Sequence, residues 1–393
     1  MNGIKEIDKT YVAGTYARFP VEIVSGKGSL VYDDAGKEYI DMGTGIGVTA
    51  FGVCDDQWVS AVTKQLTAVQ HMSNLYYTRP CALLAQKLCE KTGMKKVFFG
   101  NSGAEANECA IKVARKYAAE KKGAEYSTVI TMKNSFHGRT LTTLAATGQD
   151  HYHELYQPLT PGFVHADTND LADLERLVAE NKVCGILLEC IQGEGGVLPL
   201  DGDFIRGAAE IAAREDILLI IDEVQTGNGR TGKLYSYMNF GISPDVVTTA
   251  KGLGGGLPLG ACLIGEKAQN VLGFGDHGST FGGNPVACAG ATSIVDRLDE
   301  AFLADVRKKS DYIFSALSGA AGVESVSGLG LMVGIKPAGK TALEVVNTCL
   351  EKGVLCLTAK DKVRLLPALN IPMEQLEKAV GIIKEVCGEG AKA

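Results

Sequence analysis

Residues 217–260 read ILLIIDEVQTGNGRTGKLYSYMNFGISPDVVTTAKGLGGGLPLG. The stretch opens with an apolar run that ends on Asp222. It closes with a second apolar run, residues 246–250, which leads into Lys251 and a glycine-rich turn. Short apolar runs of this kind are typical of buried strands. An acid and a lysine at the exit ends of two neighbouring strands can hold opposite ends of one flat, charged ligand, so we interpret the rest of the chain around this pair.

The segments before this stretch alternate between strand-like and helical patterns. The runs VFFG, STVITM and GILLEC are predicted strands, and the stretches that begin NSGAEANECA and FIRGAAEIAA contain predicted helices. Because such alternation places helices on both faces of a mostly parallel sheet, the sequence predicts an α/β fold. Ligands of these sheets bind beyond the carboxyl ends of the strands, which is where the polar motifs of this chain fall.

Composition divides the chain into three predicted segments. Residues 1–53 are expected to form part of a small domain, and within them residues 11–53 hold short strand-like runs with turn signals between them. Residues 54–288 carry the alternating pattern and form the predicted large domain. Residues 289–393 return to helices and short strands, with a last helix near Met373, and form the rest of a smaller α/β domain.

The composition argues against several classes of protein. A net charge of −7 argues against a general nucleic-acid binder. The N-terminus lacks an apolar core of signal-peptide length, and no window of about 18 uncharged apolar residues exists, so we expect no membrane span. The eleven cysteines include no C-x-x-C pair and no zinc-finger spacing. We therefore expect no metal site and interpret the cysteines as buried small side chains of a cytoplasmic protein.

Two polar motifs follow predicted strands. In NSGAEANE, residues 101–108, Ser102 and the next two residues begin a helix. The free amides there can cradle a phosphate, although a plain helix cap fits the same residues. In SFHGRT, residues 135–140, Phe136 can lie on a flat ring and Arg139 can pair with a carboxylate, or the two can be a core phenylalanine and a surface arginine. His137 is interpreted as structural.

The acid and the lysine of the opening stretch have a chemical interpretation. Asp222 ends a buried run, where an acid is costly unless it is paired, and a protonated pyridine nitrogen is one such partner. Gln225 can then donate to a phenolic oxygen of the same ring; the alternative is that Asp222 caps the next turn. Lys251 in a dry pocket has a lowered pKa and becomes a nucleophile. It precedes its glycines, so a GxxxxGK[ST] phosphate loop is excluded.

Together and in this order, the motifs resemble those of the class III, ω-amino, pyridoxal-phosphate-dependent aminotransferases of fold type I. NSGAEANE, SFHGRT, IQGEGGV, DEVQTG, AKGLGGG and STFGGNP carry the resemblance, and YARFPV and RLLPALNIP fit the same family. Within it, HGRTL, QGEGGV and FGGNPVACA are most similar to the acetylornithine aminotransferases. The resemblance implies a mostly parallel central sheet with helices on both faces, pyridoxal 5'-phosphate as cofactor, and a homodimer.

The resemblance also implies roles for individual residues. Lys251 binds the cofactor covalently and later moves a proton, and Asp222 keeps the pyridine nitrogen protonated. The implied cofactor site is Ser102, Gly103, Ala104, Phe136, Asp222, Glu223, Val224, Gln225, Lys251 and Thr280, with Thr280 reaching the neighbouring subunit's phosphate. The implied substrate site is Tyr16, Arg139, Glu194, Ser279 and Arg364. Arg139 and Arg364 grip carboxylates there, and Glu194 shields Arg364 when an ornithine derivative binds.

The implied reaction is ping-pong transfer of an ω-amino group from N-acetylornithine to 2-oxoglutarate, giving glutamate. Ile46 stands where ornithine aminotransferases have tyrosine, which leaves room for an acyl group. Succinylornithine, succinyldiaminopimelate, ornithine or 4-aminobutyrate transamination stay open, as does a glutamate-semialdehyde-type aminomutase. The chain departs from the family in GVCDDQ, residues 52–57, in Cys190, and in Asn228, whose position is usually small and apolar.

Overall fold

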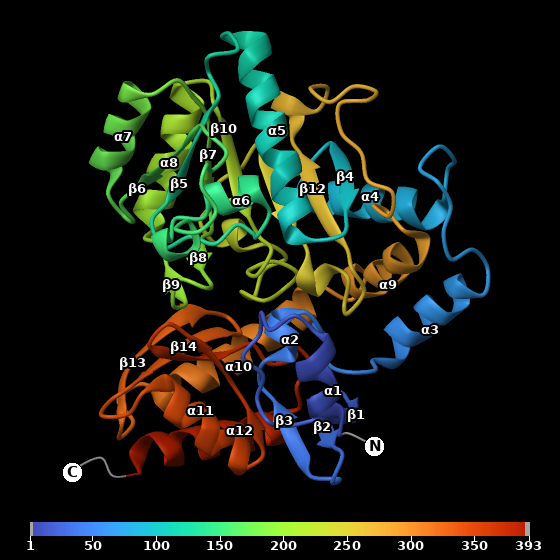
Figure 1. The fold of residues 1–393 in the computed structure, drawn as a ribbon, viewed down its shortest axis with the longest axis vertical. Coiled ribbons are helices and arrows are strands. Elements are labelled where there is room, and N and C mark those ends of the chain that lie inside the picture. The colour runs from blue at the N-terminus through green and yellow to red at the C-terminus, as the bar shows by residue number, and fades with distance from the viewer. Residues whose placement is uncertain (1–2, 390–393) are drawn as a thin grey trace.

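A computed structural model describes residues 3–389 of the chain. Residues 1–2 and 390–393, which belong to the first and third predicted segments, lie outside the described residues. Figure 1 shows a large α/β layer above a smaller unit that is built from strands of the N-terminal part (blue) and from helices and strands of the C-terminal part (orange to red).

The large layer is built on a seven-stranded sheet in the order β4-β12-β11-β10-β7-β5-β6. Its strands are β4 (Lys96–Gly100), β5 (Thr128–Met132), β6 (Phe163–Ala166), β7 (Val183–Leu188), β10 (Leu218–Asp222), β11 (Val246–Thr249) and β12 (Gly260–Ile264). Strand β12 runs antiparallel to β11 and β4, and the other pairs are parallel. The prediction of a mostly parallel sheet is therefore confirmed.

Both faces of this sheet are buried, as strand β10 illustrates. Leu218 and Ile220 belong to one apolar cluster, which contains the buried side of α5 (Gly103–Lys121). Leu219 and Ile221 belong to a second cluster, which contains the buried side of α8 (Gly202–Arg214). Since alternate side chains of a strand point to opposite faces, helices cover both faces, and a continuous apolar run such as LLII is required.

The smaller unit joins the two ends of the chain. Strand β15 pairs in parallel with β3, so that Val354 lies opposite Ile40. Its sheets contain β1 (Ile23–Lys27), β2 (Leu30–Asp33), β3 (Glu38–Asp41) and β15 (Val354–Leu355), and β13 (Val323–Leu329), β14 (Met332–Pro337), β17 (Lys362–Leu365) and β16 (Leu357–Ala359). Its helices are α10 (Glu300–Leu317), α11 (Ala342–Glu351) and α12 (Met373–Gly388). The predicted boundary after residue 288 falls inside α9 (Pro285–Val295). The division into three segments stays a prediction.

Shorter elements complete the fold. They are α1 (Ile4–Tyr11), α2 (Thr44–Gly47), α3 (Asp56–Leu66), α4 (Arg79–Thr92), α6 (Leu141–Ala146), α7 (Leu171–Glu180), the hairpin β8 (Ile191–Gln192) and β9 (Leu198–Pro199), and 3-10 turns at Asp150–Tyr152, Ser236–Asn239, Lys251–Leu253 and Glu266–Ala268. Within residues 3–389, no helix is long and apolar enough to cross a bilayer. Across the same residues, no group of three or more His, Cys, Asp or Glu side chains is arranged to hold a metal ion.

The topology positions the acid and the lysine of the opening stretch. Strands β10 and β11 are parallel neighbours, and Asp222 lies opposite Thr248. Their carboxyl ends therefore meet at one edge of the sheet, with Asp222 at the end of β10 and Lys251 in the turn after β11. The juxtaposition predicted from the two apolar runs is confirmed.

Candidate active site

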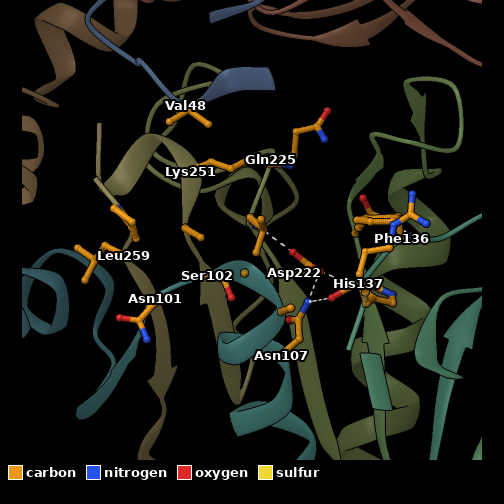
Figure 2. Close-up of a pocket in the computed structure, with 18 of the residues that line it drawn as sticks. Val48, Asn101, Ser102, Asn107, Phe136, His137, Asp222, Gln225, Lys251 and Leu259 are labelled. Atoms are coloured by element: carbon orange, nitrogen blue, oxygen red, sulfur yellow. Dashed lines mark hydrogen bonds and ion pairs between the residues drawn. The ribbon is translucent and has the colours of Figure 1, made fainter. Parts of the chain in front are cut away.

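A cavity of about 440 Å³ opens beyond the carboxyl ends of β10 and β11. Asp222, Lys251 and Gln225 line it, together with the first residues of α5 and the loop after β5. Figure 2 shows Lys251 on one side of this space and Asp222 on another, with the start of α5 below them. The cavity is thus built from the motifs that follow the strands.

The carboxylate of Asp222 is held rigidly. It is 3% exposed. Oδ2 accepts a hydrogen bond from Asn107 Nδ2 at 2.8 Å and lies 2.8 Å from His137 Nδ1, and Oδ1 accepts from the Val224 amide at 2.9 Å. The orientation of Asn107 is itself fixed, since its Oδ1 accepts from Thr248 Oγ1 at 2.7 Å. These contacts stabilise a buried carboxylate that faces the cavity.

Lys251 enters the cavity from a backbone in the left-handed region, with φ +45°. For a residue other than glycine this conformation costs about 1–3 kcal/mol, and surrounding contacts have to maintain it. Burial lowers the pKa of Lys251; the nearby Arg364 acts in the same direction, while Glu194, Asp222 and Glu189 oppose it. A lysine whose pKa is lowered has more of the neutral amine, which is the nucleophilic form.

The glycine-rich turn after Lys251 packs against Trp58 of α3. The indole Nε1 donates to the Gly254 carbonyl at 3.1 Å. A Cβ on Gly255, whose φ is +62°, would lie 2.8 Å from the same nitrogen. The turn therefore needs glycine for close packing against an aromatic ring.

The start of α5 faces the cavity with free amides. Ser102 is the N-cap, and its Oγ accepts from the Glu105 amide at 3.2 Å. A Cβ on Gly103 would lie 2.6 Å from Val224 Cγ1, so only glycine fits between the helix and the strand end. The helix-cap interpretation of NSGAEANE is confirmed, since Ser102 caps the helix. The phosphate cradle stays a prediction, and the unpaired amides of the first turn are compatible with it.

One wall of the cavity carries Phe136 and Arg139. The Arg139 guanidinium lies 4.1 Å from the Tyr152 ring centroid and 5.5 Å from that of Phe136. Glu189 accepts from the Phe136 amide at 3.0 Å and from the Gly193 amide at 3.1 Å. Burial raises the pKa of Glu189 to about 7. The loop after β5 is thereby tied to the loop after β7, and Arg139 is held by aromatic faces.

An ion pair between a buried arginine and a partly exposed glutamate contacts Gln225, which lines the cavity. Arg364, 3% exposed, pairs with Glu194 and donates to Gln225 Oε1 at 3.2 Å. Gln225 Nε2 in turn lies 3.3 Å from Glu194 Oε1. Burial alone would raise the pKa of Glu194. The charge and hydrogen bond of Arg364, the charge of Lys251 and the Gln225 hydrogen bond together outweigh burial, and the net shift of this pKa is downward. Arg364 is therefore masked by an ionised acid, whereas Arg139 makes no ion pair with an acid among residues 3–389.

A family model described as aminotransferase class-III matches residues 11–387. The chain belongs to this family. It is 49% identical to an acetylornithine aminotransferase of Haemophilus ducreyi, with 98% of each chain covered. It is 41% identical to a succinylornithine transaminase of Yersinia pseudotuberculosis, with 96% of this chain and 95% of the relative covered.

Solved structures support the same assignment. An ornithine aminotransferase of Toxoplasma gondii has a TM-score of 0.93 and 31% identity, with 98% of this chain and 94% of that chain covered. An N-acetylornithine aminotransferase of Stenotrophomonas maltophilia has a TM-score of 0.84 and 32% identity, with 98% of each chain covered. The resemblance stated from the motifs, including the fold class, is therefore confirmed.

The cofactor of this class-III aminotransferase is pyridoxal phosphate. The residues of the cavity fit it. A buried carboxylate suits a protonated ring nitrogen, a helix start with free amides suits a phosphate, and Lys251 suits the aldehyde. Gly103, against which Val224 packs, lines the same cavity.

The single chain does not bring every predicted site residue to the cavity. Tyr16 is 73% exposed and lies outside it. Ser279 and Thr280 line a separate hollow with His71 and Asn74. The Glu223 carboxylate turns into the core, where it accepts from Ser236 Oγ at 2.6 Å, so its side chain is not available to the cavity.

Ile46, on which the preference for an acylated substrate was based, also lies outside the residues that line this cavity. It is 38% exposed, and its backbone is left-handed. Val48 of the same loop lines the cavity instead. The position of Ile46 in the single chain therefore does not support a preference for acylated substrates, and that preference has to rest on other observations.

Sequence reasoning missed Asn107, Glu189 and Tyr152. Asn107 lies one helical turn after Gly103, so a polar residue at that spacing on the buried side of α5 was a usable signal. Glu189 follows a fully buried strand, as Asp222 does, and the same argument applies to it. For Tyr152, which lies in a 3-10 turn, we find no sequence signal.

Proposed function

We propose that this class-III aminotransferase transfers the ω-amino group of N-acetylornithine to 2-oxoglutarate in arginine biosynthesis. The observation that carries the proposal is the pair of arginines near Lys251: Arg139 without an acid and Arg364 masked by Glu194. A donor with one carboxylate needs one exposed arginine. A dicarboxylate acceptor needs a second, which becomes free when the Glu194 side chain moves aside.

The roles proposed for the cavity residues follow from their chemistry. When bound, pyridoxal phosphate supplies an electron sink at the reacting carbon. Asp222 would hold a proton on the ring nitrogen, and Gln225 would donate to the phenolic oxygen. Phe136 would pack on the ring, and the amides of Gly103 and Ala104 with Ser102 would bind the phosphate. Lys251, as the neutral amine, would act as the general base toward the ω-carbon proton and as the general acid that returns it.

The names of the relatives support the acyl preference. Acetylornithine aminotransferases of Haemophilus ducreyi and Methanocaldococcus jannaschii are 49% and 42% identical to the chain. The succinylornithine transaminase of Yersinia pseudotuberculosis, 41% identical, makes succinylornithine the second candidate donor. Both donors carry one free carboxylate and an acylated α-amine, so both suit the arginine pair described above.

Half-reaction spectra test the proposal. Purified holoenzyme is mixed with acetylornithine, succinylornithine, ornithine or 4-aminobutyrate, and loss of the visible cofactor band is followed. We expect acetylornithine to give the largest ratio of rate constant to apparent Kd, and Lys251→Ala to give no turnover. Faster reaction with succinylornithine would establish the second candidate. Turnover by Lys251→Ala, or repeated turnover of the donor without any amino acceptor, would contradict the mechanism.

We also propose that the active unit is a homodimer in the cytoplasm. Thr280 and Ser279 lie beside a surface that exposes Val69, Leu75 and Phe281, and a second copy placed there would bring Thr280 to the neighbouring cofactor. All eleven cysteines are free, which suits a reducing compartment. Sedimentation velocity tests the dimer. Mixing Thr280→Ala with Lys251→Ala tests whether activity is shared between subunits.

A further inference from the structure

The backbone at Lys251 adopts a conformation that its own sequence does not favour. Its φ of +45° is uncommon for a residue other than glycine. A strained conformation persists at a functional site only where neighbouring groups over-determine it. The contacts on the preceding residues, Thr249 and Ala250, therefore decide where the Lys251 side chain begins.

Asn228 makes those contacts. It is 2% exposed, and its Nδ2 donates to Thr249 Oγ1 at 2.9 Å and to the Ala250 carbonyl at 3.2 Å. The Ala250 carbonyl also accepts from the Leu253 amide at 2.9 Å, which closes the turn around Lys251. Both amide hydrogens of Asn228 are thus committed to the two residues before Lys251.

The Oδ1 oxygen of the Asn228 amide has no hydrogen-bond partner among residues 3–389, which is unfavourable for a buried group. A flipped amide could still accept from the Thr249 hydroxyl, but it would lose the bond to the Ala250 carbonyl and place Oδ1 against that oxygen. A buried unsatisfied oxygen is unfavourable, so the two bonds donated by Nδ2 account for the orientation of the side chain.

The backbone of Asn228 suits the same role. Its φ is +57°, a conformation that asparagine adopts more readily than most residues. The next residue, Gly229, is fixed by a bond from its amide to the Leu234 carbonyl at 3.1 Å. Asn228 is therefore a rigid donor held against the end of β11.

The two threonines that end β11 bond to different partners, one on the side of Asp222 and the other on the side of Lys251. Thr248 donates to Asn107, which donates to Asp222, on one face of the strand. Thr249 accepts from Asn228 on the other face. Adjacent strand residues point to opposite faces, so one strand end orients both charged groups of the cavity.

We propose that Asn228 is a positioning residue that holds the turn carrying Lys251 through Thr249 and Ala250, and so sets the approach of the lysine amine. The proposal rests on the role given to Lys251 under the proposed function. The proposal also explains why residue 228 is polar here, where the family usually has a small apolar residue.

The test uses full-length holoenzyme and the variant Asn228→Gly, which removes the donor without adding left-handed strain. Asn169→Gly is the matched control, since Asn169 is also left-handed, with φ +64°, but is exposed and does not line the cavity. We measure the pH midpoint of the visible cofactor band without substrate, then kcat and KM for both substrates. The melting temperature of each apoprotein monitors folding.

For Asn228→Gly we expect a midpoint shifted by about half a pH unit or more and a kcat about 10- to 100-fold lower, the size expected for a misplaced catalytic group, with KM changed less than about twofold. Asn169→Gly should match the wild type. Because Asn228→Gly can fail to fold, Thr249→Val and Thr249→Ser form a second pair. We expect the valine variant to show the shift and the serine variant to restore the wild-type midpoint.

A folded Asn228→Gly protein with wild-type midpoint and kcat would overturn the proposal. So would equal effects in Asn169→Gly, or a serine variant no better than the valine variant. The proposed function fails separately: a wild-type band that acetylornithine does not bleach would refute the donor, while the midpoint shift in the absence of substrate would still report on Asn228.

Discussion

The masking of Arg364 by Glu194 predicts that Glu194→Gln binds the dicarboxylate acceptor more tightly. In the free enzyme Arg364 is 3% exposed and pairs with Glu194, whose side chain is 28% exposed. An incoming carboxylate has to replace Glu194 at the guanidinium. The neutral glutamine keeps the shape of the side chain and removes the competing charge.

The size of the effect follows from the pair's surroundings. Two unit charges about 4 Å apart attract by about 4 kcal/mol at an effective dielectric constant of about 20. Since Glu194 is partly exposed, solvent screens the pair, and we take about 1–2 kcal/mol as the part that the acceptor has to overcome. This energy corresponds to about a 5- to 30-fold lower apparent Kd for 2-oxoglutarate.

The assay is the second half-reaction. The pyridoxamine form of each variant is mixed with increasing 2-oxoglutarate, and the return of the visible band gives the apparent Kd. The acetylornithine half-reaction should change less than about threefold, because its carboxylate binds Arg139. Glu175→Gln, which removes a solvent-exposed pair with Arg214, is the control. An unchanged or higher Kd for 2-oxoglutarate, or an equal gain for acetylornithine, would refute the reasoning.

Three further predictions concern the cavity walls. Burial raises the pKa of Glu189 to about 7, so the folded protein keeps a proton that the unfolded chain releases. Stability therefore falls as pH rises from about 4.5 to 7, and Glu189→Gln should flatten that part of the melting profile. Tyr152→Leu removes the aromatic face beside Arg139 and should raise KM about 2- to 30-fold with little change in kcat; unchanged KM would contradict this role. Gly103→Ala places a Cβ 2.6 Å from Val224 Cγ1 and should weaken cofactor retention on dialysis, by about 1–3 kcal/mol; full retention would show that the helix start can yield.

The strands that carry Asp222 and Lys251 were predictable because both are continuous apolar runs, and their apposition followed from the parallel sheet. The start of α5 was predictable because Ser102 is a residue type that caps a helix and its bond reaches only to the Glu105 amide. These features depend on short-range chemistry, so a single sequence contains them.

The remaining features depend on contacts between distant segments. Asn107 reaches Asp222 from a helix, and Glu189 fastens two loops, so neither role is visible in its own neighbourhood. The antiparallel strand β12 was missed because its apolar run follows the glycine-rich turn directly. Tyr16 and Thr280 were assigned from the resemblance alone, and their place in the site stays a prediction.

The contact between Trp58 and the glycine-rich turn has a practical consequence. Trp58 is the single tryptophan of the chain, and its indole donates to Gly254, three residues after Lys251. Indole emission depends on hydrogen bonding and on nearby chromophores. The native protein therefore contains an optical reporter beside its reactive lysine, and rearrangement of that turn can be followed by intrinsic fluorescence without an added label.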